Sequence, residues 1–314
     1  MDRNLALEFV RVTEAAAIAA ARWVGRGEKK KADGAAVDEM RDRLNQIDFS
    51  GRIVIGEGAK DEAPELFTGE RVGKGAKPAI DLAVDPLECT DSVAFGRYNA
   101  LSVIATGERN SLLSAPDTYM EKIAVGPKAR RVISLNASPR VNIKRVADAL
   151  GKKVQDIVVV ILDRERHHGL ISDVRKAGAR VRLITDGDVA GAVATSMSGS
   201  GIDILMGVGG STEAVLAAVA IKTLGGEIQC RFKPKDDHHR ALIKKHRLTT
   251  KKIYTVRDLA GGKSHTFTAT GVIDGPLLRG VQFTDHAEII THSLVIRSKS
   301  GTLRYITTHH HHYG

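Results

Sequence analysis

The first 46 residues have the hydrophobic spacing of two amphipathic helices. Apolar side chains recur every three or four positions over residues 5 to 24 and again over residues 35 to 46, which is the period of an α-helix. The stretch between them, residues 25 to 34, begins and ends with glycine and contains three consecutive lysines. This stretch places Asp33 at the start of the second helix. An N-cap role would by itself explain a carboxylate at that position.

Short apolar runs predict strands in the rest of the first half. The runs at residues 53 to 55, 80 to 84 and 101 to 106 are rich in isoleucine, valine, leucine and alanine, as strands are. The first run leads to Glu57, which stands between two glycines, and the second leads to Asp85, which precedes a proline. Because proline disfavours helix at the residue before it, we expect the strand to stop at Asp85 and the chain to turn sharply there.

The second half alternates strands with helices. Apolar runs at residues 156 to 162, 180 to 185, 202 to 206 and 227 to 232 predict strands, and helical spacing fills the intervals. Continuous apolar strands that alternate with helices indicate a parallel sheet with both faces covered. Ligands of such sheets lie beyond the carboxyl ends of the strands. The segments of interest are therefore residues 163 to 168, 186 to 188 and 207 to 210.

After the last of these helices the pattern becomes rich in β-hairpins, at residues 266 to 273, 294 to 298 and 303 to 307. The change of rhythm predicts two domains, an N-terminal α+β domain over residues 1–150 and a C-terminal α/β domain over residues 151–314. The last strands could return to the first domain. The expected fold class is α/β, with a mixed sheet in the N-terminal part and a parallel-rich sheet in the C-terminal part.

Composition narrows the class of protein. The chain has 314 residues and a mass of 33.8 kDa, with 27% charged and 42% hydrophobic residues, which suits a folded protein with a large core. Its two cysteines form neither a C-x-x-C pair nor a disulfide framework, as expected in a reducing compartment. The start of the chain lacks the pattern of a signal peptide, and no apolar stretch reads as a membrane span. We expect a cytoplasmic protein with no membrane partner.

The net charge of +10 and the pI of about 9.6 raise the question of nucleic-acid binding. Aromatic residues make up only 4% of the chain and the basic residues occur in short scattered groups, whereas base-stacking surfaces need aromatic side chains. A solvated basic surface that attracts anionic metabolites is the simpler interpretation, so we expect no nucleic-acid partner. The histidine run, residues 309 to 312, is interpreted as a tail or a tag remnant.

Acidic residues follow strands or glycines at several places. Carboxylates gathered in one cleft repel one another and raise one another's pKa values unless a cation neutralises them. Ligand sets made only of oxygen select hard ions, so Mg²⁺ or Mn²⁺ is expected. Neither the cysteines nor His167 and His168 have the spacing of a zinc site. The acidic residues concerned are Asp33, Glu57, Asp85, Glu88, Asp186, Asp188 and Glu213.

The segment from Asp85 to Thr90 combines two carboxylates, a proline and a hydroxyl group. A turn at this point lets both acids meet the same pair of metal ions. Thr90 can begin a helix whose free N–H groups donate to a bound phosphate, while its hydroxyl orients a metal-bound water. This is the layout of metal-assisted phosphoester hydrolysis. An ordinary strand, turn and helix with a threonine cap would explain the segment equally well if it stood alone.

A bisphosphorylated substrate needs a second anion site away from the metals. Arg164 and Arg166 follow a predicted strand, and arginine binds phosphate well. The glycine-rich turn at residues 207 to 210 lets the backbone approach a ligand, although it lacks the spacing of a dinucleotide site. Asp186 and Asp188 suit sugar hydroxyls or simply begin the next helix.

Six motifs follow one another along the chain: RVTEAAAIAAARWVGRGEKKKAD (11 to 33), VIGEG (54 to 58), AVDPLECT (83 to 90), APDTYMEKIAVGP (115 to 127), ITDGDVAGA (184 to 192) and SLVIRSKSGT (293 to 302). Together they resemble the bacterial class II fructose-1,6-bisphosphatases, including relatives that also hydrolyse sedoheptulose 1,7-bisphosphate. The resemblance runs from about Asn4 to Tyr305. It implies a layered αβαβα sugar-phosphatase fold, a homo-oligomer (dimer or tetramer), dependence on Mn²⁺ or Mg²⁺, and hydrolysis of the 1-phosphate of fructose 1,6-bisphosphate in gluconeogenesis.

The resemblance also implies roles for single residues. Asp33 and Glu57 match ligands of one metal, and Asp85, Glu88 and Glu213 match ligands of the other. Thr90 matches the residue that activates the attacking water, and Glu88 is assigned with it to the catalytic step. The residues that match contacts to the sugar phosphate are Glu88, Cys89, Thr90, Tyr119, Arg164, Glu165, Arg166, Asp186, Gly187, Asp188 and Gly210.

The chain departs from the family pattern at several positions near these residues. Cys89 stands where the family usually has glycine, at a small cost only if its φ is negative. Residues 211 to 214, Ser-Thr-Glu-Ala, replace Ala-Pro-Glu-Gly, Glu165 replaces a proline, and Ala59 replaces a glutamate. These departures leave open a sugar-phosphate-binding protein with little or no catalysis. Steep, salt-dependent DNA binding would revive the nucleic-acid interpretation.

Overall fold

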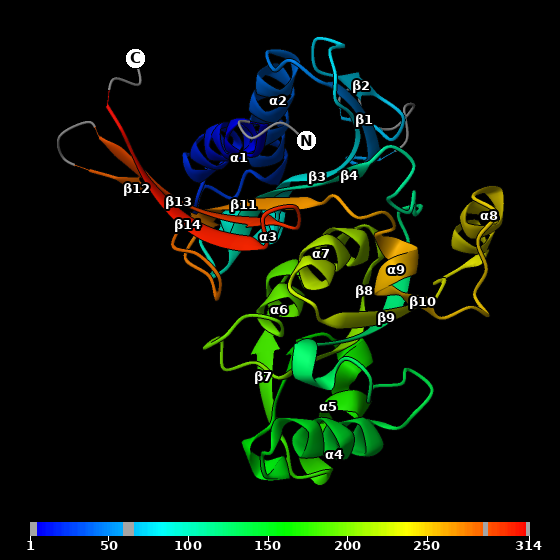
Figure 1. Ribbon diagram of the computed structural model, residues 1–314. Helices are drawn as coiled ribbons and strands as arrows, with labels where there is room; N and C mark the ends of the chain where they lie inside the picture. The colour runs from blue at the N-terminus through cyan, green and yellow to red at the C-terminus, as the bar shows by residue number, and fades with distance from the viewer. Residues whose placement is uncertain (1–4, 59–65, 285–287, 312–314) are drawn as a thin grey trace. The chain divides into compact units, whose positions relative to one another are not determined.

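The computed structural model describes residues 5–58, 66–284 and 288–311, and the chain divides into two compact units (Figure 1). Unit 1 comprises Met1–Leu112 and Gly262–Gly314, and unit 2 comprises Leu113–Gly261. Each unit contains a mixed sheet and helices, which confirms the expected α/β class. Among the described residues, no helix combines the length and the apolar character that a membrane crossing needs.

Unit 1 is built on an eight-stranded sheet with the order β12-β13-β11-β4-β3-β1-β2, and β14 also pairs with β13. Strands β1 and β3 run parallel, so their carboxyl ends lie at the same edge. The helices of its described part are α1 (Leu5–Ala21), α2 (Lys29–Asn45) and α3 (Thr90–Phe95). The strands are β1 (Ser50–Ile55), β2 (Arg71–Val72), β3 (Ala79–Glu88), β4 (Ala100–Glu108), β11 (Thr266–Ile273), β12 (Gln282–Phe283), β13 (Ile289–Arg297) and β14 (Thr302–His310).

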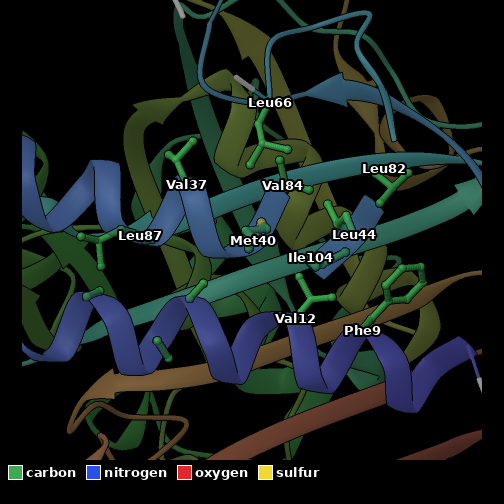
Figure 2. Close-up of a cluster of buried hydrophobic side chains, with 14 of the residues drawn as sticks. Phe9, Val12, Val37, Met40, Leu44, Leu66, Leu82, Val84, Leu87 and Ile104 are labelled. Atoms are coloured by element: carbon green, nitrogen blue, oxygen red, sulfur yellow. The ribbon is translucent and has the colours of Figure 1, made fainter. Parts of the chain in front are cut away.

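Helices α1 and α2 lie side by side and share a core with strands β3 and β4 (Figures 1 and 2). Figure 2 shows Phe9 of α1 and Met40 of α2 beside Leu82 and Ile104 of the sheet, and all four side chains are fully buried. Phe9 also meets Phe49 edge to face, with ring centroids 5.6 Å apart, a favoured aromatic geometry. This core fixes α2, and with it Asp33, against the sheet that carries the other predicted ligands of unit 1.

Unit 2 is built on a six-stranded sheet with the order β10-β9-β5-β8-β6-β7. Strands β6, β7 and β8 are mutually parallel, whereas β5 runs antiparallel between β8 and β9. The strands are β5 (Tyr119–Val125), β6 (Val158–Leu162), β7 (Arg180–Ile184), β8 (Ile204–Gly210), β9 (Glu227–Phe232) and β10 (Tyr254–Thr255). The α-helices are α4 (Pro139–Leu150), α5 (His168–Lys176), α6 (Val189–Ala194), α7 (Ser211–Thr223), α8 (Asp237–Lys245) and α9 (Val256–Leu259), and the 3₁₀ turns are η1 (Pro127–Ala129), η2 (Val154–Asp156) and η3 (Glu165–His167).

Helices cover both faces of the sheet of unit 2, and Figure 1 shows α6 and α7 on the face opposite α4 and α5. Ile143 of α4 and Val174 of α5 share a core with Ile123 of β5 and Val159 of β6. Because side chains alternate along a strand, Lys122, the neighbour of Ile123, points toward the other face. That alternation places a lysine inside the layer formed with α6 and α7.

The start of α2 differs from the sequence prediction. The helix begins at Lys29 rather than near residue 35, so Asp33 lies inside the helix and not at its start. The residues from Lys29 to Ala32 are good helix formers, and they extend the helix toward its N-terminus. The alternative in which Asp33 serves only as an N-cap is therefore ruled out, because Glu28 precedes the helix.

Strand β3 does not stop at Asp85. It continues through Pro86 to Glu88, and its register against β4 shifts between Asp85 and Glu88. A strand can accommodate proline at a bulge, because no ladder N–H is needed at that position. The expected sharp turn is therefore a bulged strand.

The parallel arrangement expected for the second half holds for β6, β7 and β8 but not for β9, which pairs with the antiparallel strand β5. We did not predict β5, because Glu121 and Lys122 interrupt its apolar pattern. Residue 150, the expected domain boundary, is the last residue of α4 within unit 2. Strands β11, β13 and β14 belong to the sheet of unit 1.

The C-terminal histidines are part of the fold as far as they are described. His309 and His310 are the last two residues of β14 and pair with Ile290 and Ile289 of β13. The first two residues of the run therefore extend the C-terminal strand. The strand predicted over residues 303 to 307 thus runs from Thr302 to His310, and as an edge strand it needs only one apolar face.

Candidate active site

Two predicted metal ligands lie where the parallel strands of unit 1 end. The register of β1 and β3 pairs the residues two positions before Glu57 and Asp85, so both acids come to the same edge of the sheet. The N–H of Glu57 donates to the carbonyl oxygen of Leu66 at 3.1 Å, which fixes the turn. Gly56 is required beside it, because a Cβ atom there would lie 1.9 Å from the same oxygen.

The bulge in β3 brings Asp85 and Glu88 to one face of the sheet. Asp85 pairs with Val103 and Glu88 pairs with Leu101. Val103 and Leu101 are two residues apart in β4 and therefore share a face, and paired residues of adjacent strands share a face as well. In an unbroken strand, residues three positions apart would point to opposite faces. The extra residue is what allows these two carboxylates to project together.

Asp33 lies on the part of α2 that is attached to α3. Lys29, one turn earlier on α2, forms an ion pair with Asp91 of α3. Two backbone N–H groups of the preceding loop donate to the carbonyl oxygens of Val93 and Ala94, at 2.9 and 2.8 Å. Burial raises the pKa of the Asp33 carboxyl, so a cation beside this carboxylate would offset its loss of hydration.

Thr90 begins α3, as the sequence predicted. Its hydroxyl donates to the carbonyl oxygen of Leu87 at 3.2 Å. Because the proton of the hydroxyl is used in this way, the oxygen of Thr90 can serve as an acceptor. Glu88, two residues earlier, is buried at 2% exposure, so the hydroxyl and the carboxylate are held by the same short segment.

Cys89 adopts the left-handed backbone conformation that the family's glycine would favour, with φ of +74°. For a residue with a Cβ atom this conformation costs about 1–2 kcal/mol. The thiol is buried, and the side-chain amide of Asn99 lies 3.5 Å from Sγ. The condition under which we expected a small cost, a negative φ, is therefore not met. The strain lies directly between the predicted metal ligand Glu88 and the predicted catalytic Thr90.

The predicted sugar-phosphate residues of unit 2 lie along one edge of its sheet. Residues 164 to 166 follow β6, residues 186 to 188 follow β7, and Gly210 ends β8. Tyr119 begins β5, and it reaches the same edge because it pairs with Gly210 in the antiparallel direction. Glu165 is exposed in the 3₁₀ turn between the two arginines. The rule that ligand-binding residues follow strand ends thus gathers these residues correctly.

Both arginines at this edge are held by neighbours. Arg164 donates from Nη2 to Oδ1 of Asp186 at 3.2 Å. Arg166 donates from Nε and Nη2 to the carbonyl oxygen of Val208, at 3.2 and 2.9 Å, and its guanidinium lies 5.4 Å from the ring centroid of Tyr119. An arginine has five N–H groups, so each side chain keeps donors for an anion while its position is fixed.

A buried ion pair beneath this edge was missed by the sequence analysis. Lys122 of β5 donates to both carboxylate oxygens of Asp188, at 2.8 and 2.7 Å, and both residues are buried. Burial by itself lowers the pKa of Lys122, but attraction to Asp188 and Glu213 outweighs it and the pKa is raised. The available signal was a pair of charged residues, Glu121 and Lys122, in the middle of a mostly apolar segment. Asp188 precedes α6 without capping it through its side chain.

Two glycines of β8 pass close to carboxylates. A Cβ atom on Gly209 would lie 2.1 Å from Oδ2 of Asp188, and one on Gly210 would lie 1.9 Å from Oε2 of Glu213. The glycine-rich turn that the sequence marked as a weak signal therefore makes room for acids rather than for a dinucleotide.

The fifth predicted metal ligand, Glu213, is the third residue of α7 in unit 2, whereas the other four belong to unit 1. The hydroxyl of Thr212 donates to its Oε2 at 2.8 Å, a contact that the family's proline could not make. Within residues 5–58, 66–284 and 288–311, no three histidine, cysteine, aspartate or glutamate side chains are arranged to hold a metal ion. The ligand set therefore stays a prediction, and Ala59 lies outside the described residues.

The strain at Cys89 gives a first prediction. Replacing Cys89 by glycine removes about 1–2 kcal/mol of strain but adds about 0.4–1 kcal/mol of freedom to the unfolded chain. The free energy of unfolding should therefore rise by up to about 1.5 kcal/mol, measured by urea denaturation. Cys89→Ala keeps the strained backbone, removes the thiol and should not stabilise. If glycine destabilised the protein more than alanine does, strain at this position would be refuted.

The buried pair gives a second prediction. Lys122→Met leaves the carboxylate of Asp188 buried without its partner, and the free energy of unfolding should fall by about 3–5 kcal/mol. The double variant with Lys122→Met and Asp188→Leu removes both charges and should recover most of that loss, because no ion remains buried. Denaturant unfolding measures both variants. A double variant no more stable than the single one would show that packing, not charge, explains the loss.

The chain is similar to known proteins along almost its whole length. The family model described as bacterial fructose-1,6-bisphosphatase, glpX-encoded, matches residues 3–310. Two proteins from Synechococcus sp. strains JA-2-3B'a(2-13) and JA-3-3Ab are named D-fructose 1,6-bisphosphatase class 2/sedoheptulose 1,7-bisphosphatase. Each is 43% identical to this chain over an alignment 335 positions long, which covers 99% of this chain and 96% of the relative. The protein of that name from Trichodesmium erythraeum strain IMS101 is 41% identical, covering 99% of this chain and 97% of its own. The chain belongs to the bacterial, glpX-encoded fructose-1,6-bisphosphatase family.

Proposed function

We propose that this protein hydrolyses the 1-phosphate of fructose 1,6-bisphosphate to give fructose 6-phosphate and phosphate, and that it also accepts sedoheptulose 1,7-bisphosphate. Family membership supports the reaction class. The single structural observation that carries the proposal is the bulge of β3, which brings Asp85 and Glu88 to one face at the sheet edge that Glu57 also reaches. Acids collected at one edge and followed by a threonine suit a metal-assisted phosphatase.

The acids of unit 1 fit a hard divalent ion. Asp33, Glu57, Asp85 and Glu88 offer only carboxylate oxygens, the donors that Mg²⁺ and Mn²⁺ prefer. The raised pKa of Asp33 marks a carboxylate whose burial a cation would offset. When bound, such an ion polarises phosphoryl oxygens and makes a water molecule more acidic. We assign these four residues as ligands, with Glu213 as the fifth predicted one and Mn²⁺ or Mg²⁺ as the ion.

The protein's own groups then have separate tasks. Thr90, whose hydroxyl proton is directed at Leu87, accepts a hydrogen bond from the attacking water and orients it. Glu88, held in the same segment, is assigned with Thr90 to the catalytic step. Both groups need a fixed backbone, because a misplaced nucleophile loses the advantage of proximity. The bulge and the start of α3 supply that fixed backbone.

The edge of unit 2 is suited to the sugar phosphate. Arg164 and Arg166 bind phosphate oxygens with the N–H groups that their protein partners leave over. Asp186 and the backbone around Gly187, which has φ of +55°, face the sugar hydroxyls in this proposal. Asp188 keeps lone pairs beyond the two contacts with Lys122.

The setting of the enzyme follows from the same family resemblance. We place it in the bacterial cytoplasm as a homo-oligomer, a dimer or a tetramer, with gluconeogenesis as its role.

A second candidate is a sugar-phosphate-binding protein with little turnover. The observation that favours it is the strained Cys89 beside Thr90, since a strained backbone there could misplace the hydroxyl. Both candidates bind sugar phosphates, and only turnover separates them.

Phosphate release gives the third prediction. With Mn²⁺ the protein should release phosphate from fructose 1,6-bisphosphate, and EDTA should abolish the release. Thr90→Ala should lower kcat by about 100-fold or more while the Kd for fructose 6-phosphate, measured by calorimetry, stays within about twofold, because water activation and not binding is lost. Thr250→Ala, at an exposed position, serves as the control and should keep full activity.

Several outcomes would contradict the proposal. A folded, metal-loaded protein that binds fructose 6-phosphate but releases no phosphate would support the binding protein instead. Recovery of turnover in Cys89→Gly would then locate the defect in the strained turn. If Thr90→Ala retained its kcat, the assignment of Thr90 would be wrong.

A further inference from the structure

His167 occupies the place where two parallel strands of unit 2 separate. The ladder between β6 and β8 ends with Val160 and Leu205, although β6 continues beside β7 and β8 continues beside β5. The chain then turns through η3, and the ring of His167 is buried there at 2% exposure. Its Nδ1 lies 2.8 Å from the carbonyl oxygen of Leu162, and the N–H of Val208 donates to its Nε2 at 2.8 Å. The imidazole therefore bridges the two strand ends after their own hydrogen bonds stop.

The two partners define the protonation of the ring. A carbonyl oxygen can only accept, so Nδ1 carries the proton, and a backbone N–H can only donate, so Nε2 must be the unprotonated acceptor. Burial lowers the pKa of His167, which keeps this neutral form at neutral pH. Gly207 permits the close approach, since a Cβ atom there would lie 3.1 Å from Nε2 and its φ is +142°.

The residue that His167 holds is also the residue that holds Arg166. The carbonyl oxygen of Val208 accepts from Nε and Nη2 of Arg166, while the N–H of Val208 is bound to His167. Two of the five N–H groups of Arg166 are used in this way, and three remain for an anion. Tyr119 supports the guanidinium from one side. Val208 thus links the buried imidazole to the proposed phosphate contact.

A pocket of about 160 Å³ adjoins these groups, and Arg166, His167, Val208 and Lys233 are among its lining residues. The pocket presents positive charge. Of the charged groups that line it, Glu121 is paired with Arg231 at 2.7 Å and Lys122 is paired with Asp188. That leaves Arg166 and the exposed Lys233 as its cations.

The charged groups around His167 come from several elements. Arg166 belongs to the same turn, Asp188 follows β7, and Lys233 follows β9. Glu121 and Lys122 line the same pocket from β5. Burial is the largest cause of the lowered pKa of His167, and the two nearby cations also oppose protonation, whereas the hydrogen bond to Leu162 and the charge of Asp188 favour it.

We propose that His167 is a positioning residue that orients Arg166 for the phosphate of the substrate through the peptide groups of Val208. The inference rests on the proposed function, because it assigns a phosphate to Arg166. His167 itself touches no substrate. It supplies an acceptor that fixes the N–H of Val208 and so fixes the carbonyl group that aims the guanidinium.

The first test compares His167→Phe with His168→Phe. Phenylalanine fills the space of the imidazole but cannot accept from Val208, whereas His168 is exposed at the start of α5 and serves as the matched control. We expect the Kd for fructose 6-phosphate, measured by calorimetry, to rise about tenfold in His167→Phe and to change less than about twofold in His168→Phe. His167→Gln retains a donor and an acceptor and should keep most of the affinity, with thermal unfolding to verify that each variant is folded.

A second test separates positioning from a general structural role. In a background with Arg166→Ala, the further change His167→Phe should weaken binding by less than about twofold, because His167 acts through Arg166. At pH values below the lowered pKa of His167 the ring is protonated and cannot accept from Val208, so the affinity of the unmodified protein should fall there relative to that of His167→Gln, which does not titrate. This ratio cancels the titration of the phosphate itself.

The outcomes distinguish this inference from the proposed function. If the unmodified protein binds fructose 6-phosphate but releases no phosphate from the bisphosphate, the proposed function fails and the binding data still decide the role of His167. Three results would overturn the inference. These are an unchanged affinity in His167→Phe, an equal loss with and without Arg166, and no binding of fructose 6-phosphate by the unmodified protein.

Discussion

One extra residue in strand β3 determines what unit 1 can do. Side chains alternate along a strand, and residues three positions apart point to opposite faces unless a bulge intervenes. The register shift between Asp85 and Glu88 removes that conflict, and the parallel pairing with β1 brings Glu57 to the same edge. Acids collected in this way repel one another unless a cation joins them. The geometry of the backbone, more than any single contact, therefore underlies the proposal of a divalent metal.

In unit 2, hydrogen bonds and ion pairs fix the positions of charged side chains. The carboxylate of Asp188 is bound at both oxygens by a buried lysine, and Arg166 is bound by the carbonyl oxygen of Val208. A buried ion pair contributes little net stability once desolvation is counted, but it fixes the geometry of its members. The neutral imidazole of His167 likewise fixes the position of Val208, because it accepts a hydrogen bond from the N–H group of that residue. Fixed dipoles and charges suit phosphoryl transfer, in which the protein contributes mainly position and electrostatic stabilisation.

The ends of several strands could be predicted from the sequence, because ligand-binding residues generally follow the strands of such sheets. Polar residues that follow apolar runs mark the edge where ligands bind, and this rule placed Arg164, Arg166 and Asp186 correctly at one edge. It failed for β5, because Lys122 looks like an interruption until its partner Asp188, distant in the sequence, is known. It failed also at Asp85, since proline ordinarily ends a strand and a bulge cannot be read from local preference. Only the folded chain shows which distant residues are buried together and where the backbone is irregular. The φ of Cys89 is one such property.

The central claim is that the carboxylates of unit 1 bind a divalent metal ion. Its most direct test is a crystal structure of the protein soaked with Mn²⁺, with the ions located by their anomalous scattering. The account predicts manganese bound to carboxylate oxygens of Asp33, Glu57, Asp85 and Glu88. Manganese bound only to other residues, with these four side chains unliganded, would contradict it.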